Sequence, residues 1–223
     1  QHLKIFRSQL GVGILVTPTI KEMFAGKREL LNRIEPSLVQ HFVELLKKDK
    51  APQYIDFLMS ICMLGTDTKP EPLSKVQNMV TYELLEEHMS LLPQLRLEPN
   101  QKGVMRVLFR VEGQTTEFLN LANFKRPDFV NSKGRKEDYA GWIMNSALSE
   151  LDLTQRSFRY LIRCTNLYGR LALGRNQKAL KLLICNPSLC LDYSTILSVM
   201  KEESLPYLFR ARYTTLMARL FVD

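Results

Sequence analysis

The side chains that most often carry catalysis or bind metal ions are few and scattered in this 223-residue sequence. His2, His41 and His88 are far apart, and none has a histidine or cysteine at ligand spacing. We interpret each of them as an ordinary surface or core histidine. The pair Gly11 and Gly13 lacks the third glycine and the strand–helix context of a dinucleotide-binding turn. The sequence also has no phosphate-binding loop, zinc-protease motif or nucleophile elbow.

The cysteines show no pattern of a metal site. Cys62 and Cys164 lie in apolar helical segments, where a thiol behaves as a small hydrophobic side chain. Cys185 and Cys190 flank Pro187 at a spacing that differs from the Cys-x-x-Cys motif. No carboxylate pair stands in an apolar setting that would raise the pKa of one member for acid catalysis. We therefore predict a non-enzymatic protein without a metal or a cofactor, although lone residues could still converge in space.

Basic residues form the most distinctive chemical pattern. The chain has 31 Lys and Arg against 23 Asp and Glu, giving a net charge of +8. Arg156, Arg159, Arg163 and Arg170 lie at helical spacing on one side of a long predicted helix. This candidate binding patch could pair with acidic neighbours in a larger assembly, or bind a phosphoinositide head group or an acidic protein. Nucleic acid is not expected, because no aromatic residues alternate with the basic ones for base stacking.

Apolar periodicity predicts the helices that must position these residues. Pro18, Pro52, Asp152 or Thr154, and Ser204 are the predicted helix starts, and Gly26 and Gly174 are predicted ends. Residues 52–64 are apolar nearly all round, so we expect their helix to be enclosed by neighbours. The predicted helices cover residues 17–26, 38–46, 52–64, 73–87, about 152–174, 176–184, 193–200 and 204–221, with another beginning near residue 138.

The middle of the chain differs in character. Residues 93–121 alternate strand-forming residues with turn residues, which predicts two or three short strands in a meander. Residues 65–72 read as a connector, and residues 124–136 as a solvated basic loop. The predicted fold class is mainly α, an armadillo-like solenoid of helix pairs with a small β insertion. We divide it into residues 1–88, a first helical part; 89–136, the insertion and loop; and 137–223, a second helical part.

Three colinear stretches resemble the RIH domain shared by inositol 1,4,5-trisphosphate receptors and ryanodine receptors. The first lies in residues 9–43 and includes KRELL at residues 27–31; the second is KAPQYIDFL at residues 50–58, followed by Ile61 and Cys62; the third comprises LALGRN at residues 171–176 and LPY at residues 205–207, with Arg210, Ala211, Leu216, Met217, Val222 and Asp223. Residues 86–136 depart most from the family pattern.

The resemblance implies a cytosolic domain of a homotetrameric calcium-release channel of the endoplasmic reticulum, placed just after the ligand-binding core. Such a domain would relay ligand-induced motion toward the pore through contacts with other domains and subunits. The alternative is a stand-alone helical module that binds an anionic partner. The family's inositol trisphosphate contacts lie before Gln1, and the arginine patch, at about 21 Å of helix, is too long to grip one inositol ring. The sequence begins without Met and is expected to be part of a longer chain; no run of about 18 uncharged apolar residues predicts a membrane span.

Overall fold

The computed structural model describes residues 19, 22–24, 26–66, 69–99, 105–126, 128–131 and 134–222. These residues form a mainly helical protein with two small antiparallel sheets, which confirms the mainly α class and the β insertion. The helices are α3 (Arg28–Asn32), α4 (Pro36–Lys48), α5 (Pro52–Ile61), α6 (Ser74–Thr81), α7 (Tyr139–Asn145), α8 (Leu153–Ala172), α9 (Gln177–Cys185), α10 (Tyr193–Lys201) and α11 (Tyr207–Met217). The strands are β1 (Met63–Thr66), β2 (Lys69–Pro72), β3 (Gln94–Pro99), β4 (Met105–Arg110) and β5 (Leu119–Asn120).

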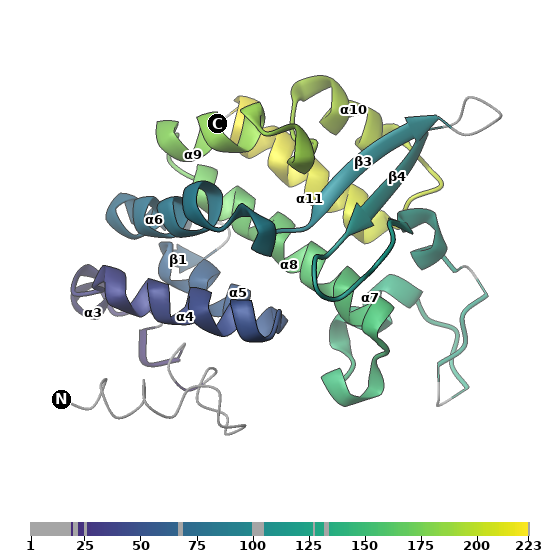
Figure 1. The fold of residues 1–223 in the computed structure, drawn as a ribbon, viewed down its shortest axis with the longest axis horizontal. Helices are drawn as coiled ribbons and strands as arrows, with labels where there is room; N and C mark the ends of the chain where they lie inside the picture. The colour runs from purple at the N-terminus through teal and green to yellow at the C-terminus, as the bar shows by residue number, and fades with distance from the viewer. Residues whose placement is uncertain are drawn as a thin grey trace.

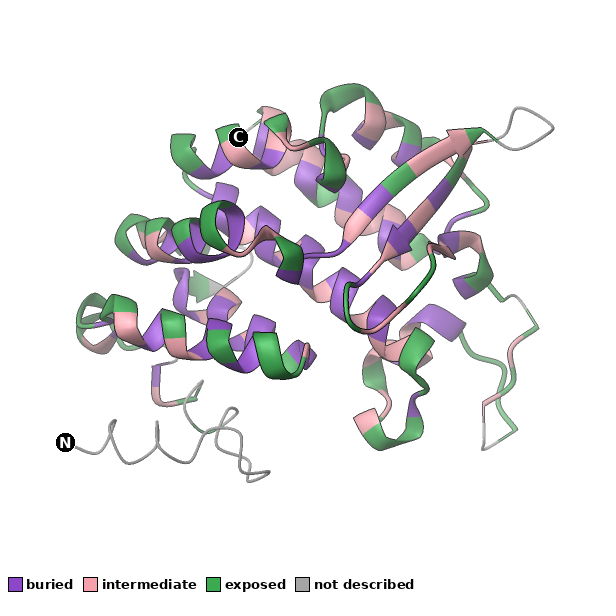
Figure 2. Ribbon diagram, viewed as in Figure 1, coloured by how far each residue is buried: buried purple, intermediate pink, exposed green. Residues whose placement is uncertain are grey.

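Helix α8 runs through the middle of the molecule (Figure 1). It packs against α5, α6, α7, α9 and α11. The helix that begins at Pro52 is enclosed as expected, since Ile55, Phe57, Leu58 and Ile61 of α5 are fully buried. The start of α8 is fixed by a capping box. The Asp152 carboxylate accepts from the backbone N–H of Gln155 at 2.8 Å, and the side-chain oxygen of Gln155 accepts from the backbone N–H of Asp152 at 2.9 Å. Buried residues line much of the length of α8 (Figure 2).

The first helices pack through a cluster of aromatic rings. Helices α4 and α5 each begin with proline at the first helical position, where its missing amide is not needed. Phe42 of α4 stacks on Phe57 of α5 with ring centroids 3.8 Å apart, and both rings are fully buried. The predicted helix at residues 73–87 is confirmed as α6 continued by the π-helical turn Tyr82–Glu87. The predicted start at Thr17 and Pro18 lies outside the described residues, whereas residues 22–24 are helical and Gly26 adopts a φ of +67°.

The predicted helix over residues 52–64 was too long. It ends at Ile61, and Met63 and Leu64 belong to a hairpin in which β1 pairs with β2. An unbroken apolar run fits a buried helix and a buried strand equally well, so it did not reveal β1. Strand β2 was missed because it contains two prolines, which are uncommon inside strands. Gly65, within β1, has a φ of +82°, and an added Cβ there would lie 2.3 Å from the Lys69 carbonyl oxygen.

The predicted meander is confirmed as a three-stranded sheet of order β3-β4-β5. Leu95 pairs with Phe109 in the register between β3 and β4. The sheet is joined to α8 through Phe124, which contacts Phe109 at 5.8 Å and stacks on Phe158 at 4.3 Å between centroids. In the basic segment that follows, the side chains of Lys125, Arg126, Arg135 and Lys136 are exposed, as predicted; Lys133 lies outside the described residues.

The last helices match their predicted positions apart from one start. Helix α11 begins at Tyr207 with Pro206 at its N-cap, so the predicted Ser204 cap was wrong. The proline disfavours helical geometry at Leu205, and the helix therefore cannot extend back to Ser204. Among the described residues no single helix is long and apolar enough to cross a membrane. One pair of segments, Gln177–Cys185 and Pro187–Lys201, is long and apolar enough only when the two are taken together, and a bend of 77° separates them.

Two buried tyrosines of α8 should respond differently to loss of the hydroxyl group. Tyr160 donates to the Leu91 carbonyl oxygen at 2.9 Å, whereas the equally buried Tyr168 hydroxyl has no hydrogen-bond partner among the described residues. We expect Tyr160→Phe to lower the free energy of unfolding by about 1–3 kcal/mol, because it strands a buried carbonyl. Tyr168→Phe should leave stability unchanged or raise it. Urea denaturation of both variants is the measurement, and equal losses would contradict the hydrogen-bond assignment.

Candidate functional site

The arginine patch predicted on α8 divides into two parts with different surroundings. At its N-terminal end, Arg156 donates from Nε to the carbonyl oxygens of Leu148 and Leu151, both at 3.0 Å. Arg159 donates to the Ser146 carbonyl oxygen at 2.7 Å. These two side chains are half-buried and hold the segment that connects α7 to α8. Burial and the neighbouring Arg163 lower the pKa of Arg159.

Arg163 joins α8 to the first helices. Its Nε lies 3.2 Å from the Asp56 carboxylate of α5, and about a quarter of each side chain is exposed. Partial burial reduces the screening of this ion pair by water compared with a pair on the open surface. The exposed pair between Arg28 and Glu71, by contrast, has at least half of each side chain in solvent. Asp56 therefore gives α5 a charged contact with α8 in addition to its apolar packing.

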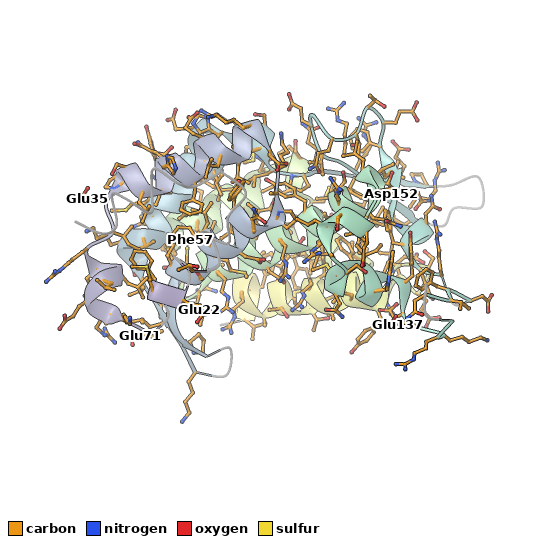
Figure 3. The ribbon with its side chains drawn as sticks, turned by 90° about the horizontal axis from the view of Figure 1, so that it is seen from below. Glu22, Glu35, Phe57, Glu71, Glu137 and Asp152 are labelled. Atoms are coloured by element: carbon orange, nitrogen blue, oxygen red, sulfur yellow. The ribbon has the colours of Figure 1, made fainter. Side chains whose placement is uncertain are left out.

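The C-terminal part of the patch opens into a pocket between α8 and α11, which lie alongside each other in Figures 1 and 3. Arg163 and Arg170 from α8 line it together with Arg212 and Arg219 from α11 and the turn that continues it. The pocket has a volume of about 400 Å³. Sequence reasoning missed Arg212 and Arg219. Their seven-residue spacing, which equals that of Arg163 and Arg170, was the signal that could have paired the two helices.

The end of α8 is held by a residue that sequence reasoning also missed. Gln77 of α6 is fully buried, and its side-chain amide donates to the carbonyl oxygens of Arg170 at 2.7 Å and Leu173 at 3.1 Å. The last carbonyls of a helix have no partner within the helix, so this amide caps α8 from another element. Just beyond, Gly174 has a φ of +71°, and an added Cβ would lie 2.6 Å from Pro72 Cγ of β2. Helix α6 and strand β2 therefore both meet the C-terminal end of α8.

Thiol and imidazole groups do not form a site in the part of the chain that the structure describes. Burial raises the pKa of the Cys62 thiol to about 12 and raises that of Cys164, which fits their predicted role as small hydrophobic side chains. Cys185 is exposed and Cys190 is partly buried. No group of three or more His, Cys, Asp or Glu residues among those described could hold a metal ion. His2 lies outside the described residues, as do Gly11 and Gly13.

The labelled carboxylates in Figure 3 show how the acidic groups are distributed. Glu35 and Glu71 lie toward one end of the molecule, and Glu137 and Asp152 toward the other. Asp152 is used as the N-cap of α8, and Glu137 accepts from the Asn131 side-chain amide at 2.6 Å. These groups serve local hydrogen bonds in separate regions. By contrast, four arginines line the pocket between α8 and α11, which we call the four-arginine pocket.

Removing the Gln77 amide should weaken the joint at the end of α8. We expect Gln77→Met, which keeps the length of the side chain, to lower the free energy of unfolding by about 2 kcal/mol because two buried carbonyl oxygens lose a donor. Gln177→Met, at an exposed position of α9, is the matched control and should change stability by less than about 0.5 kcal/mol. Chemical denaturation compares the two, and equal effects would mean that the Gln77 bonds do not hold the joint.

Comparison with known proteins relates this chain to a family model and to a receptor-like protein. A family model described as the RIH domain matches residues 1–96. The inositol 1,4,5-trisphosphate receptor-like protein A of Dictyostelium discoideum is 24% identical over 202 residues, which cover 91% of this chain. The chain spans about 5% of the length of that relative. The matches confirm that the chain resembles the RIH region of the inositol 1,4,5-trisphosphate receptor family.

Proposed function

We propose that the chain is a non-catalytic domain of an inositol trisphosphate receptor-like calcium-release channel and relays motion between the ligand-binding region and the pore. The RIH match over residues 1–96 and the receptor-like relative support this proposal. The domain would lie on the cytosolic side of the endoplasmic reticulum, within a homotetramer. Its partners would be other domains and subunits of the same channel, with the trisphosphate bound mainly outside this segment.

The observation that carries the relay proposal is the joint between α8 and the first helices. Asp56 of α5 pairs with Arg163, Gln77 of α6 caps the end of α8, and Pro72 of β2 lies against Gly174. Contacts of three kinds thus connect the RIH-like part to the C-terminal helices. A displacement of α5 and α6 would be passed to α8 as a rigid-body movement, because packed interiors resist local deformation. We propose that residues 89–136 separate the two helical parts, residues 1–88 and 137–223.

The helix pairs support an armadillo-like arrangement as a further part of the proposal. Helices α4 and α5, α8 and α9, and α10 and α11 pack as consecutive pairs. In solenoids such pairs stack so that each buries the apolar face of the next. We infer that this stacking continues into neighbouring segments of a longer receptor chain. The terminal pairs of the present chain would then contact further repeats.

The relay role predicts a separation of ligand binding from calcium release. In the full receptor, Asp56→Asn removes the half-buried carboxylate between α5 and α8. If the pair carries about 1 kcal/mol of coupling, calcium release at a given ligand occupancy should fall about fivefold. The affinity of the receptor for inositol trisphosphate should stay within about twofold of the unmodified receptor.

Glu71→Gln is the matched control, because it removes the carboxylate of an exposed arginine pair. It should change neither the affinity nor the release. Radioligand binding and calcium flux from the same membranes provide both readouts. Unchanged release in Asp56→Asn, or a parallel loss of ligand affinity, would reject the relay role of this joint.

A second candidate function is that of a helical module for an anionic partner. The four-arginine pocket favours it, because two of its arginines come from the predicted patch. The two functions are compatible, since a domain within a channel can also bind a regulatory ligand. Arg156 and Arg159 do not line the pocket, so the part of the predicted patch that belongs to this candidate site is Arg163 and Arg170.

A further inference from the structure

The four-arginine pocket differs from an ordinary basic surface in its geometry. Arg163 and Arg170 are seven residues apart on α8, as are Arg212 and Arg219 on α11 and its continuation. Seven residues span about 10.5 Å along a helix, and packed helices lie about 8–10 Å apart. The two pairs therefore frame one compact space, unlike the complete patch on α8, which extends over about 21 Å.

The lining of this pocket is strongly cationic. The other lining residues are Met59, Thr165, Asn166, Leu173, Thr215 and Leu216, with Gly169 between the arginines of α8, so no carboxylate belongs to the described lining. Asp56 offsets part of the charge of Arg163 from the α5 side. Arg170, Arg212 and Arg219 have further interactions in the chain. Four guanidinium groups, and no carboxylate, therefore line the described space.

Gly169 keeps the space between the two helices open. A Cβ at this position would meet only Leu216 Cδ2, at 3.9 Å, which is ordinary van der Waals contact. An added Cβ would therefore fit at this position of the pocket lining. The volume of about 400 Å³ lies in the range of small-molecule sites, whereas a flat basic surface would offer no such enclosure.

We propose that this pocket binds a small polyphosphate anion. Guanidinium groups recognise phosphate oxygens through paired, charge-assisted hydrogen bonds, and several arginines around one enclosed space match several phosphate oxygens. The side-chain amide of Asn166 adds a neutral donor beside the cations, whereas the hydroxyl groups of Thr165 and Thr215 donate to the carbonyl oxygens of Leu161 and Ala211 within their own helices. Bound anion would connect α8 to α11 and so would stiffen the C-terminal helices. The inference does not depend on the chain being part of a channel.

Calorimetric titration of inorganic pyrophosphate into the 223-residue chain tests the site at an ionic strength of about 0.15 M. We expect saturable binding with one site per chain. Arg212→Gln combined with Arg219→Gln should weaken this binding at least about tenfold, because charge-assisted contacts are lost. Lys48→Gln combined with Arg106→Gln removes the same charge from exposed positions outside the pocket and should leave the affinity unchanged. Absence of saturable binding, or equal weakening in the two double variants, would overturn the proposal.

A second pair of variants keeps all four arginines and so separates binding from folding. Gly169→Glu places a carboxylate inside the pocket as an internal substitute for the anion, and Gly169→Gln places a neutral side chain of the same size there. We expect the Glu variant to have the higher Tm at low salt, with the difference shrinking as salt is added. The Glu variant should also bind no pyrophosphate. Equal Tm values, or pyrophosphate binding retained by Gly169→Glu, would show that the pocket does not concentrate positive charge.

Discussion

The hydrogen bonds from the Gln77 amide to the carbonyl oxygens of Arg170 and Leu173 are the contact on which the arrangement of the two helical parts depends. A central helix that ends inside a protein must find donors for its last carbonyls, because water cannot reach them. Here the donor comes from a residue 93 positions earlier in the chain. The cap therefore fixes α6 to α8, and the close approach of Pro72 to Gly174 leaves β2 little freedom at the same place.

The arginines of α8 illustrate how one helix face can serve several purposes. Arg156 and Arg159 satisfy the carbonyls of an irregular connection, and Arg163 balances a carboxylate of α5. Arg163 and Arg170 also face α11, where two more arginines complete a pocket. The arginines at the N-terminal end of α8 therefore hold the connection from α7, whereas those toward its C-terminal end belong to a compact cationic pocket. This division connects the mechanical role proposed for the domain with its proposed ligand, since both involve α8.

The sequence predicted the elements with strong local signals and missed contacts between distant residues. Asp152, one of the two predicted caps, is the N-cap of α8, and Pro52 marked the start of α5 because proline fits the first helical turn. The start of α4 at Pro36 was not singled out. The β1–β2 hairpin was missed because Pro70 and Pro72 conceal a strand. Gln77 resembled any polar helix residue, since only tertiary packing buries it. Arg212 and Arg219 became part of a site only when α11 was placed beside α8.

We propose that the first helices and the C-terminal helices form one cooperative unit joined at α8. Native-state hydrogen exchange measures this most directly, by the opening free energies of buried amides at increasing denaturant concentration. We expect amides in the middle of α5, such as that of Leu58, to merge with those of α8, such as that of Leu161, into one opening that matches global unfolding. Opening of α4–α6 at a free energy several kcal/mol below that of α8 would contradict the account, because the two parts would then unfold independently.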